Sequence, residues 1–289
     1  MAFQLFSAGK LSAQKNTVID SLETVLKSAK ENTVKVITLT SLSKEYMNIS
    51  NYDKAMLYAD SALVLAVKIK YRKGQADVYG SIGMIYYYKT NYAEALKYHN
   101  TALTIRKEIG DKKGMAGSYN SISLVYKEQS KIAEALQLLF SALRINEEIG
   151  DKLGISINYG NIGRLYSHQG NYHEALNNYF ASLKIQAETG NKDKGGIAST
   201  YLNIGSIFAL QGKYPEASKY YFDALKLWEE IGDKEGIGTV YNCIGSFLYE
   251  SQNNYQEALK YHKAALKIAK EIGNTKGIYY STYYIGSIY

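Results

Sequence analysis

The residues best able to do chemistry are four histidines and one cysteine, and their spacing argues against a metal site. His168 and His173 flank an expected turn, where two ligands would still lack the third and fourth that a metal ion needs. His99 and His262 occupy the same place in two distant repeats of the chain, so they cannot converge. Cys243 stands alone, which excludes a disulfide framework and a cysteine-rich metal site. We therefore expect no metal ion and no cofactor.

Residues that serve catalysis or phosphate binding in other proteins have structural explanations in this chain. The segment Gly232–Gly238 is glycine-rich like a nucleotide-binding loop, but no strand precedes it and no Gly-Lys-Ser/Thr follows. No serine or cysteine has a histidine and a carboxylate at fixed places, and Glu134 and Glu174 are explained as helix caps. The sequence therefore predicts that the chain is not an enzyme.

Composition and charge favour a helical protein with a real core. Of 289 residues, 46% are hydrophobic and 21% charged, which is close to the globular average. One proline against 24 glycines indicates helices joined by glycine turns. The net charge of +7 is spread evenly, with both signs together as in Asp111-Lys112-Lys113, so no nucleic-acid partner is expected. No apolar run approaches the roughly 20 residues that span a bilayer.

The chain repeats itself about every 40 residues. The string Ile-Gly-Asp-Lys-x-Gly occurs at residues 109–114, 149–154 and 231–236, and Asn-Tyr-x-Glu-Ala-Leu at 91–96, 171–176 and 254–259. The alanine of the second string recurs in phase at Ala55, Ala95, Ala135, Ala175, Ala217 and Ala258. A fixed period of this length is typical of a solenoid, in which each unit buries its apolar face against its neighbours.

Each repeat has the pattern of two helices. Tyr119, Ile122 and Tyr126 are spaced by three and four residues and therefore share one face of a first helix. The second helix carries a similar stripe that includes Ala135 and Leu139.

The ends of the helices are marked by residues that cap them. Asn91 and Asn171 are expected N-caps of second helices, each followed three residues later by the glutamate of a capping box. Gly110 suits the left-handed position at a helix end, and Asp111 can cap the next first helix.

These signals divide the chain into a leading segment and a solenoid. Residues 1–15 are expected to lie outside the fold, as a disordered end or the remnant of a signal peptide, and residues 16–31 form a leading helix. The solenoid covers 32–289, with six repeats at about 36–75, 76–115, 116–155, 156–197, 198–237 and 238–278 and a truncated seventh at 279–289. A clipped signal within residues 1–13 would place the protein outside the cytoplasm, which is otherwise the default compartment.

The pattern of small residues resembles the tetratricopeptide repeat. Small residues stand in the first helix at Gly83, Ser123, Gly163, Gly205, Gly245 and Gly286, and late in the second at Ala62, Ala102, Ala142, Ser182, Ala224 and Ala265. The unit is longer than the common 34 residues, and Glu147 stands where the usual closing proline would be. This resembles the long variant of kinesin light chains, Leu-Gly-Asn repeat proteins and bacterial sensor regions. The resemblance implies an all-α, right-handed superhelical solenoid of antiparallel helix pairs.

The resemblance also implies where a partner binds. In such repeats the first helices line a concave face, and an asparagine before the Ile-Gly pair holds the backbone of an extended peptide, since an amide offers both donor and acceptor. The candidate binding residues are Asn120, Leu124, Lys127, Asn161, Arg164, Asn203 and Asn242. The asparagines could equally be structural. Binding of a free C-terminal carboxylate is not expected, because the positions at which such clamps carry Lys or Arg hold Gly80, Asn120, Gly160 and Leu202.

We therefore expect a non-catalytic scaffold that binds a protein or peptide in its groove. The alternative is that the chain is the input region of a larger signalling enzyme, a sensor histidine kinase or a nucleotide cyclase. A second copy of the chain is a further expected partner, through the exposed face of a terminal repeat. Of 29 tyrosines, 17 occupy framework positions. The C-terminal cluster of Tyr279, Tyr280, Tyr283 and Tyr284 is either an aromatic binding surface or the face that the next helix covers.

Overall fold

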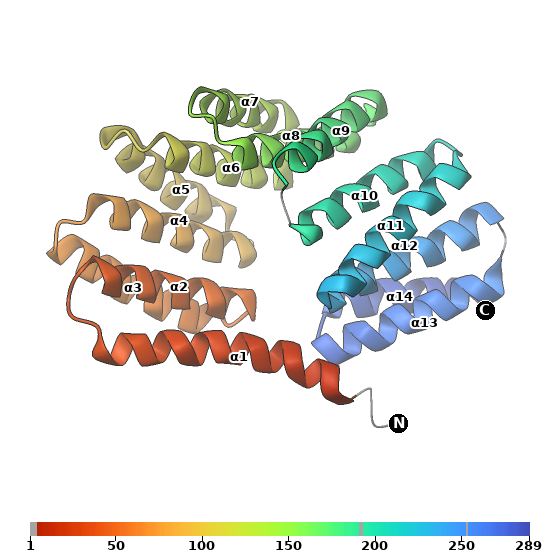
Figure 1. The fold of residues 1–289 in the computed structure, drawn as a ribbon, viewed down its shortest axis with the longest axis horizontal. Helices are drawn as coiled ribbons and strands as arrows, with labels where there is room; N and C mark the ends of the chain where they lie inside the picture. The colour runs from red at the N-terminus through yellow and green to blue at the C-terminus, as the bar shows by residue number, and fades with distance from the viewer. Residues whose placement is uncertain (1–4, 191–192, 253) are drawn as a thin grey trace. The chain divides into compact units, whose positions relative to one another are not determined.

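The structure is a computed structural model that describes residues 5–190, 193–252 and 254–289, and within them all regular structure is α-helical (Figure 1). The helices are α1 (Leu5–Ser28), α2 (Thr33–Asn48), α3 (Tyr52–Lys68), α4 (Arg72–Tyr88), α5 (Tyr92–Glu108), α6 (Lys112–Glu128), α7 (Ile132–Glu148), α8 (Lys152–His168), α9 (Tyr172–Glu188), α10 (Lys194–Leu210), α11 (Tyr214–Ile231), α12 (Lys234–Gln252), α13 (Tyr255–Ile272) and α14 (Thr275–Ile288). The even-numbered helices are the first helices of the repeats, and α3 to α13 with odd numbers are the second helices. The expected all-α fold is confirmed.

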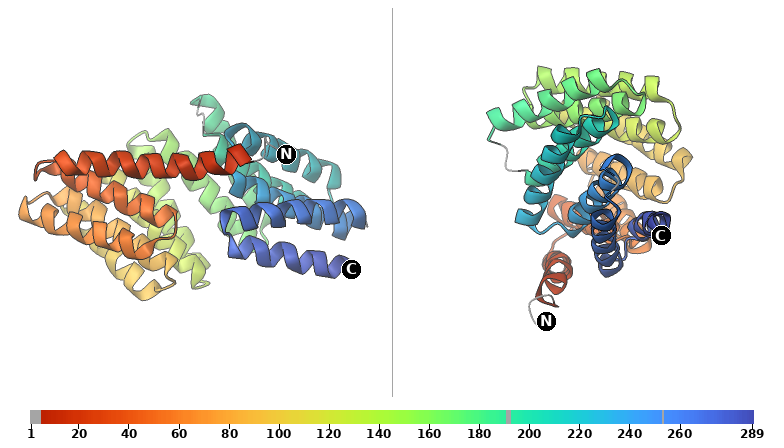
Figure 2. Two further views of the ribbon diagram at one scale, coloured as in Figure 1. Left: turned by 90° about the horizontal axis from the view of Figure 1, so that it is seen from below. Right: turned by 90° about the vertical axis from the view of Figure 1, so that its right-hand side faces the viewer.

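The chain divides into two compact units, Met1–Gly154 and Ile155–Tyr289. In the first unit α2 pairs with α3, α4 with α5 and α6 with α7, and in the second α10 pairs with α11 and α12 with α13 (Figure 2). Each second helix also contacts the next first helix, as α3 contacts α4 and α11 contacts α12. Each unit is therefore a stack of antiparallel helix pairs, stabilised by contacts between neighbours.

The helix ends follow the expected capping chemistry at Asp111 and Asn91, whereas Asn171 stands at the N-cap of α9 without a side-chain capping hydrogen bond. The Asp111 carboxylate accepts a hydrogen bond from the backbone N–H of Gly114 at 2.9 Å, and the Asn91 side chain accepts one from that of Glu94 at 3.3 Å. Residue 110 has a φ of +68°, in the left-handed region that favours glycine, which explains why a glycine stands there. The second hydrogen bond of the expected capping box, from the Asn91 backbone N–H to the Glu94 carboxylate, is not formed. The Asn91 N–H donates to the Tyr86 carbonyl, and the Glu94 carboxylate pairs with Lys97.

The helix pairs begin earlier than the sequence predicts. First helices start at residues 33, 72, 112, 152, 194 and 234, about four residues before the expected repeat boundaries, and α14 starts at Thr275. The reason is that the capping residue fixes the start of each helix, whereas the apolar stripe begins one turn later. The leading helix α1 runs from Leu5 to Ser28 and so includes most of the range expected outside the fold, while residues 1–4 lie outside the described residues.

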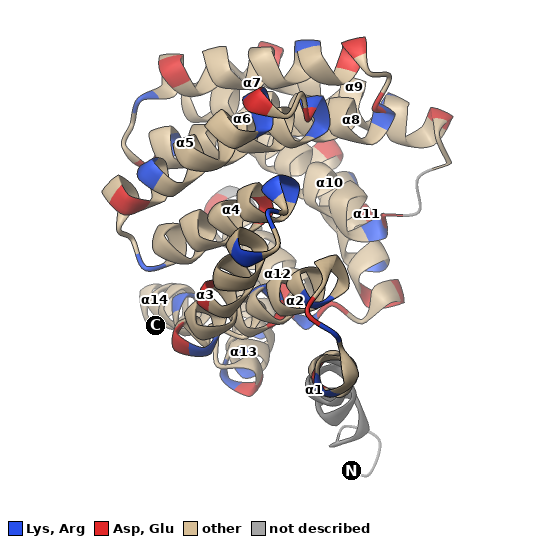
Figure 3. Cartoon of the chain, turned by 90° about the vertical axis from the view of Figure 1, so that its left-hand side faces the viewer, with Lys and Arg blue, Asp and Glu red and all other residues tan. Residues whose placement is uncertain are grey.

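Acidic and basic residues lie side by side along the helices (Figure 3). Ion pairs join the start of a first helix to the end of the second helix of the same repeat, for example Lys112 with Glu148 at 2.5 Å and Lys194 with Glu230 at 2.9 Å. Exposed pairs of this kind contribute little stability each. They do explain why the charges recur with the period of the repeat.

The leading helix α1 is held by a partly buried carboxylate contact as well as by apolar packing. The Glu23 carboxylate accepts hydrogen bonds from the hydroxyls of Tyr46 on α2 at 2.9 Å and Tyr58 on α3 at 3.1 Å. Burial, followed by the Glu23 carboxylate, raises the pKa of Tyr58 to about 12. Ile19 packs beside this contact in the same apolar cluster.

Removing this contact is expected to loosen α1. The Glu23→Ala variant leaves two tyrosine hydroxyls without their acceptor, which typically costs about 1–3 kcal/mol. Hydrogen exchange should show faster exchange of the amides of α1, with the later helices unchanged. Asp20→Ala, which removes an exposed carboxylate from the same helix, is the control. Equal protection of α1 in both variants would show that apolar packing alone holds the helix.

Candidate peptide-binding face

The first helices form the inner side of each unit. In the first unit α2 contacts α4 and α4 contacts α6, and in the second α10 contacts α12 and α12 contacts α14. Since successive first helices approach each other this closely, each stack curves toward them. The face that the first helices form is therefore the concave one in each unit, as the resemblance implies.

In the first unit the expected binding residues lie in a row on α6. Asn120, Leu124 and Lys127 are spaced by four and three residues on one side of the helix, and all three are half-buried. The Lys127 ammonium pairs with the neighbouring Glu128 carboxylate at 2.8 Å. The row thus combines an amide, an apolar side chain and a cation that already has a partner.

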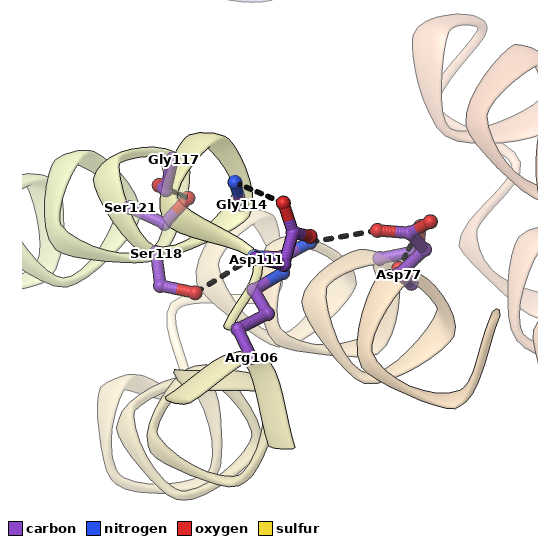
Figure 4. A network of polar contacts seen from close by, with 8 residues as sticks. Asp77, Arg106, Asp111, Gly114, Gly117, Ser118 and Ser121 are labelled. Atoms are coloured by element: carbon purple, nitrogen blue, oxygen red, sulfur yellow. Dashed lines mark hydrogen bonds and ion pairs between the residues drawn. The ribbon is translucent and has the colours of Figure 1, made fainter. Parts of the chain in front are cut away.

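Beside this row, Arg106 of α5 reaches through to the first helices (Figure 4). One guanidinium nitrogen donates to the Ser118 hydroxyl of α6 at 2.7 Å, and another donates to the Asp77 carboxylate of α4 at 2.9 Å. The Arg106 side chain is 13% exposed and that of Asp77 is 38% exposed. An arginine carries its charge at all relevant pH values, so this pair fixes two first helices relative to each other.

The surface around Arg106 is lined by small residues. A Cβ added at Gly117 would meet no atom within 4 Å, and one at Gly80 would meet only the Arg106 guanidinium at 3.7 Å. The Ser121 hydroxyl donates to the backbone carbonyl of Gly117 at 3.1 Å. The helices therefore present an open floor on which the main chain of a partner can approach closely.

Sequence reasoning missed Arg106 because it lies on a second helix, whereas the expected site residues were sought on first helices alone. A signal was present in the repeat itself. The equivalent positions are Ala66, Arg106, Asn146, Gln186, Trp228 and Ala269. Arg106 is the one charged residue among six equivalents, a departure that a repeat-by-repeat comparison can find.

In the second unit three of the expected residues, Asn161, Arg164 and Asn203, lie on the first helices α8 and α10. The Asn161 side-chain oxygen accepts a hydrogen bond from the Arg164 guanidinium at 3.0 Å, both on α8. Asn203 occupies the equivalent position on α10 and is also half-buried. The two asparagines thus stand at equivalent positions of successive first helices, and the Asn161 amide already binds Arg164.

Asn242, in contrast, lies in the interior. It is 7% exposed, its side-chain oxygen accepts from the Ser281 hydroxyl at 2.9 Å, and the same oxygen lies 3.0 Å from Nδ1 of His262. These bonds join α12, α13 and α14. Asn242 is therefore a structural residue, and we leave it out of the binding face.

The tyrosine cluster at the C-terminal end divides in two. Tyr279 and Tyr283 of α14 are 73% and 60% exposed. Tyr284 instead packs on the ring of His262, with centroids 4.9 Å apart, and its hydroxyl donates to Glu250 at 3.0 Å. Only part of the cluster is free to contact a partner.

Cys243, His99 and His262 lie in environments that keep these side chains neutral near pH 7. Burial raises the pKa of the Cys243 thiol to about 12 and lowers the pKa of His99 and of His262 to about 4. A search of the described residues finds no group of three His, Cys, Asp or Glu that could hold a metal ion. Over the same part of the chain, none of the helices combines the length and the apolar character needed to cross a bilayer.

Comparison with solved structures shows similar folds in several sensor proteins. A Rap protein complexed with Competence and Sporulation Factor matches with a TM-score of 0.69 at 14% identity, over 94% of this chain and 79% of that one. The quorum sensor NprR from B. thuringiensis, in its apo form, matches with a TM-score of 0.62 at 17% identity, over 99% and 85%.

A third match is a signal-transduction ATPase from Pyrococcus horikoshii with a tetratricopeptide repeat sensor. Its TM-score is 0.67 at 16% identity, and the match covers 99% of this chain but 45% of the ATPase. A comparison with curated protein sequences finds no match. At these identities the likeness concerns the fold alone.

Family models for the tetratricopeptide repeat match residues 74–148 and 153–230, and a second model of the same name matches 238–272. These ranges cover more than half of the chain and follow the helix pairs of the structure. The chain belongs to the tetratricopeptide repeat family.

Proposed function

We propose that the chain is a non-catalytic scaffold that binds an extended segment of another protein on its concave face. The observation that carries this proposal is the open floor of the first unit, where Gly80 and Gly117 leave room for a partner's main chain. Asn120 and Ser121 border that floor with polar side chains, and Leu124 adds an apolar contact. A main chain needs donors and acceptors together, and amide and hydroxyl side chains supply both.

Arg106 and Asp77 give the floor a charge pattern as well as a shape. The guanidinium is mostly buried and paired, while the Asp77 carboxylate is more exposed at 38%. The pair is neutral as a whole, and the Asp77 carboxylate is its more exposed side, so a hydrogen-bond donor of the partner is favoured next to Asp77. In the second unit, Asn161 and Asn203 provide amides on successive first helices.

A second candidate function is the input region of a larger signalling enzyme. The similarity to the sensor of the P. horikoshii ATPase favours it, because there such a solenoid belongs to a chain more than twice as long as the matched part. Sequencing the gene of the natural protein around the segment that encodes this chain discriminates between the two, since a kinase or cyclase motif in the same reading frame would establish an input role. Both functions use the same groove.

The groove is tested by replacing both amides of the second unit. A partner is first isolated by pull-down, and its binding segment is then titrated against the wild-type chain and an Asn161→Ala/Asn203→Ala variant. Losing two hydrogen bonds of about 0.5–1.5 kcal/mol each should weaken binding about ten-fold or more, with helicity unchanged.

A matched control replaces two exposed asparagines of second helices. The Asn100→Ala/Asn177→Ala variant removes the same number of amides from the outer side and should bind as the wild type does. If both double variants keep full affinity, the amides are structural and the partner binds elsewhere, with the exposed tyrosines of α14 as the next surface to test.

A further inference from the structure

The outer face of α3 is apolar and exposed. Leu57, Val64 and Val67 are 62%, 70% and 55% exposed. These are three of the four most exposed large aliphatic side chains among the described residues, and all three lie on α3. Spacings of seven and three residues place them along one side of the helix. An apolar stripe on the surface of a second helix needs an explanation, because isolated exposed side chains are common but aligned ones are not.

Comparison with the other repeats shows that the stripe belongs to the first repeat alone. At the place of Leu57 the later second helices carry Lys97, Gln137, Asn177, Lys219 and Lys260. At the place of Val64 they carry Thr104, Arg144, Lys184, Lys226 and Lys267. All ten of these residues are exposed, so the geometry is the same and only the chemistry differs. The change is confined to one surface, which indicates that this surface is covered.

The same side of α3 carries a negative charge at the start of the helix and a positive charge at its end. Asp53 begins the helix with a side chain that is 97% exposed and lies 3.5 Å from the Lys89 ammonium. Lys68 ends the helix with a side chain that is 65% exposed and pairs with the Glu31 carboxylate at 2.5 Å. Exposed pairs of this kind contribute little, so both groups can exchange partners when a second copy approaches. At 100° per residue, Asp53, Leu57, Val64 and Lys68 lie within a narrow sector of the helix surface. The order of this sector is acidic, apolar, apolar and basic.

Such an order is complementary to itself when two copies run antiparallel. In that arrangement Leu57 of one copy meets Val64 of the other, and Asp53 meets Lys68, twice by symmetry. Asp60 and Ser61 fall near the two-fold axis on opposite flanks of the seam. The exposed Asp60 carboxylates of the two copies meet on one flank, where solvent has to screen their repulsion, and the small Ser61 allows the two helices to approach on the other. A symmetric contact of this kind uses the same patch on both subunits.

A cavity beside the stripe gives the second copy more to contact than a flat helix. It has a volume of about 640 Å³ and is bounded by α1, α2 and α3. Leu26, Leu39 and Leu65 form its apolar wall, next to Leu57 and Val64, and the charged side chains of Glu31, Lys35, Asp60 and Lys68 line the rest. Side chains of an approaching α3 can enter it.

We propose that a second copy of this chain docks on the outer face of α3, with the two α3 helices antiparallel. The contact is separate from the concave face, so the chain can dimerise and still bind a partner there. One helix seam and its cavity bury less than the roughly 800 Å² per partner of a standard interface. The dimer is therefore weak, with a dissociation constant in the micromolar range or above.

The first experiment measures the sedimentation of the full chain over a concentration series from about 1 to 500 µM. The expected result is a reversible monomer–dimer equilibrium for the wild type. The Leu57→Lys/Val64→Lys variant copies the lysines that the fifth and sixth repeats carry at these places, and it should remain monomeric with an unchanged melting curve. Thr104→Lys, an exposed change at the equivalent place on α5, should dimerise as the wild type does.

The second experiment reverses the charges. In Asp53→Lys two lysines oppose each other in the antiparallel seam, and in Lys68→Asp two aspartates do, so each variant alone should dissociate at least ten-fold more readily. An equimolar mixture restores both oppositely charged contacts and should recover a heterodimer. Recovery in the mixture is specific for the antiparallel arrangement, because a merely destabilised helix would not recover.

Three outcomes would overturn the proposal: a wild-type chain that stays monomeric throughout the series, a dimer that survives the double lysine change, or charge variants that fail to associate when mixed. The binding of a partner segment to the concave face is read out by a separate titration. A negative result in the dimer experiments therefore does not contradict the proposed function. A negative result in the titration of the partner segment does not contradict the proposed dimer.

Discussion

Replacing Gly163 by leucine is expected to lower the free energy of unfolding by about 3 kcal/mol or more. A Cβ at this position would lie 3.0 Å from the backbone oxygen of Ala175 and 3.0 Å from two ring carbons of Tyr179. Tyr179 is 2% exposed and has no room to withdraw. Overpacking in a dense core typically costs about 1–3 kcal/mol, and a backbone neighbour cannot rotate away as a side chain can. Urea unfolding followed by circular dichroism measures the loss.

The same helix offers a matched control. A Cβ at Gly160 would meet only the Ser182 hydroxyl at 3.9 Å, an ordinary contact, so Gly160→Ala should leave stability unchanged or raise it slightly through helix propensity. If Gly163→Leu unfolds at the same urea concentration as the wild type, α8 and α9 do not approach each other as closely at Gly163 as the structure shows.

The third repeat indicates how the clash could be relieved. There Ser123 stands at the place of Gly163 and the smaller Leu139 at the place of Tyr179, and both are buried. A Gly163→Ser/Tyr179→Leu variant should therefore be less destabilised than the sum of its two single changes. A coupling of this kind shows that the two positions share one space.

The repeat and the helix ends could be predicted from the sequence because they depend on local chemistry. The six alanines in phase fix the period, and Asp111 with Gly110 fixes where one helix stops and the next starts. Small residues facing large ones, such as Gly163 and Tyr179, follow from the same alignment. Each repeat supports the interpretation of the others, so the fold is over-determined.

The candidate site was harder to predict because it depends on contacts between repeats. Asn120 and Asn242 are equivalent in sequence, yet Asn242 is bonded to His262 and Ser281 from two other helices. Arg106 reaches the floor of the groove only because Gly114 leaves space for its side chain, where a Cβ would lie 2.7 Å from Nε. Neither fact follows from the period alone.

The stability of the chain is expected to fall as the pH is lowered from about 6.5 to 4. His99 and His262 are buried, and burial lowers the pKa of each from 6.5 to about 4, the positive Arg106 adding to the effect at His99. Between these pH values the unfolded chain binds protons that the folded chain does not, so the free energy of unfolding decreases as the pH falls. The loss is at most about 3 kcal/mol for each histidine and is complete below pH 4.

The geometry explains why neither ring is protonated in the folded chain until the pH falls to about 4. The Nε2 atoms of both histidines are buried without a hydrogen-bond partner in the described part of the chain. Each ring lies against a glycine of the paired first helix: a Cβ at Gly83 would be 2.6 Å from His99, and one at Gly245 would be 2.7 Å from His262. A proton on Nε2 would therefore be a buried charge that nothing compensates.

His99→Leu separates this effect from the titration of carboxylates, which occurs mainly below pH 4.5. Leucine is the residue at the equivalent place in the third repeat, Leu139, so the variant should match the wild type within about 1 kcal/mol at pH 7.5. At pH 4.5 it should be more stable than the wild type, because one buried base has been removed. His173→Gln, a change at an exposed histidine of α9, should keep the full pH dependence. Urea unfolding at pH 7.5 and pH 4.5 measures the stability of each variant. If His99→Leu loses as much stability as the wild type between these pH values, the ring of His99 is protonated in the folded chain at pH 4.5 and must have a hydrogen-bond acceptor.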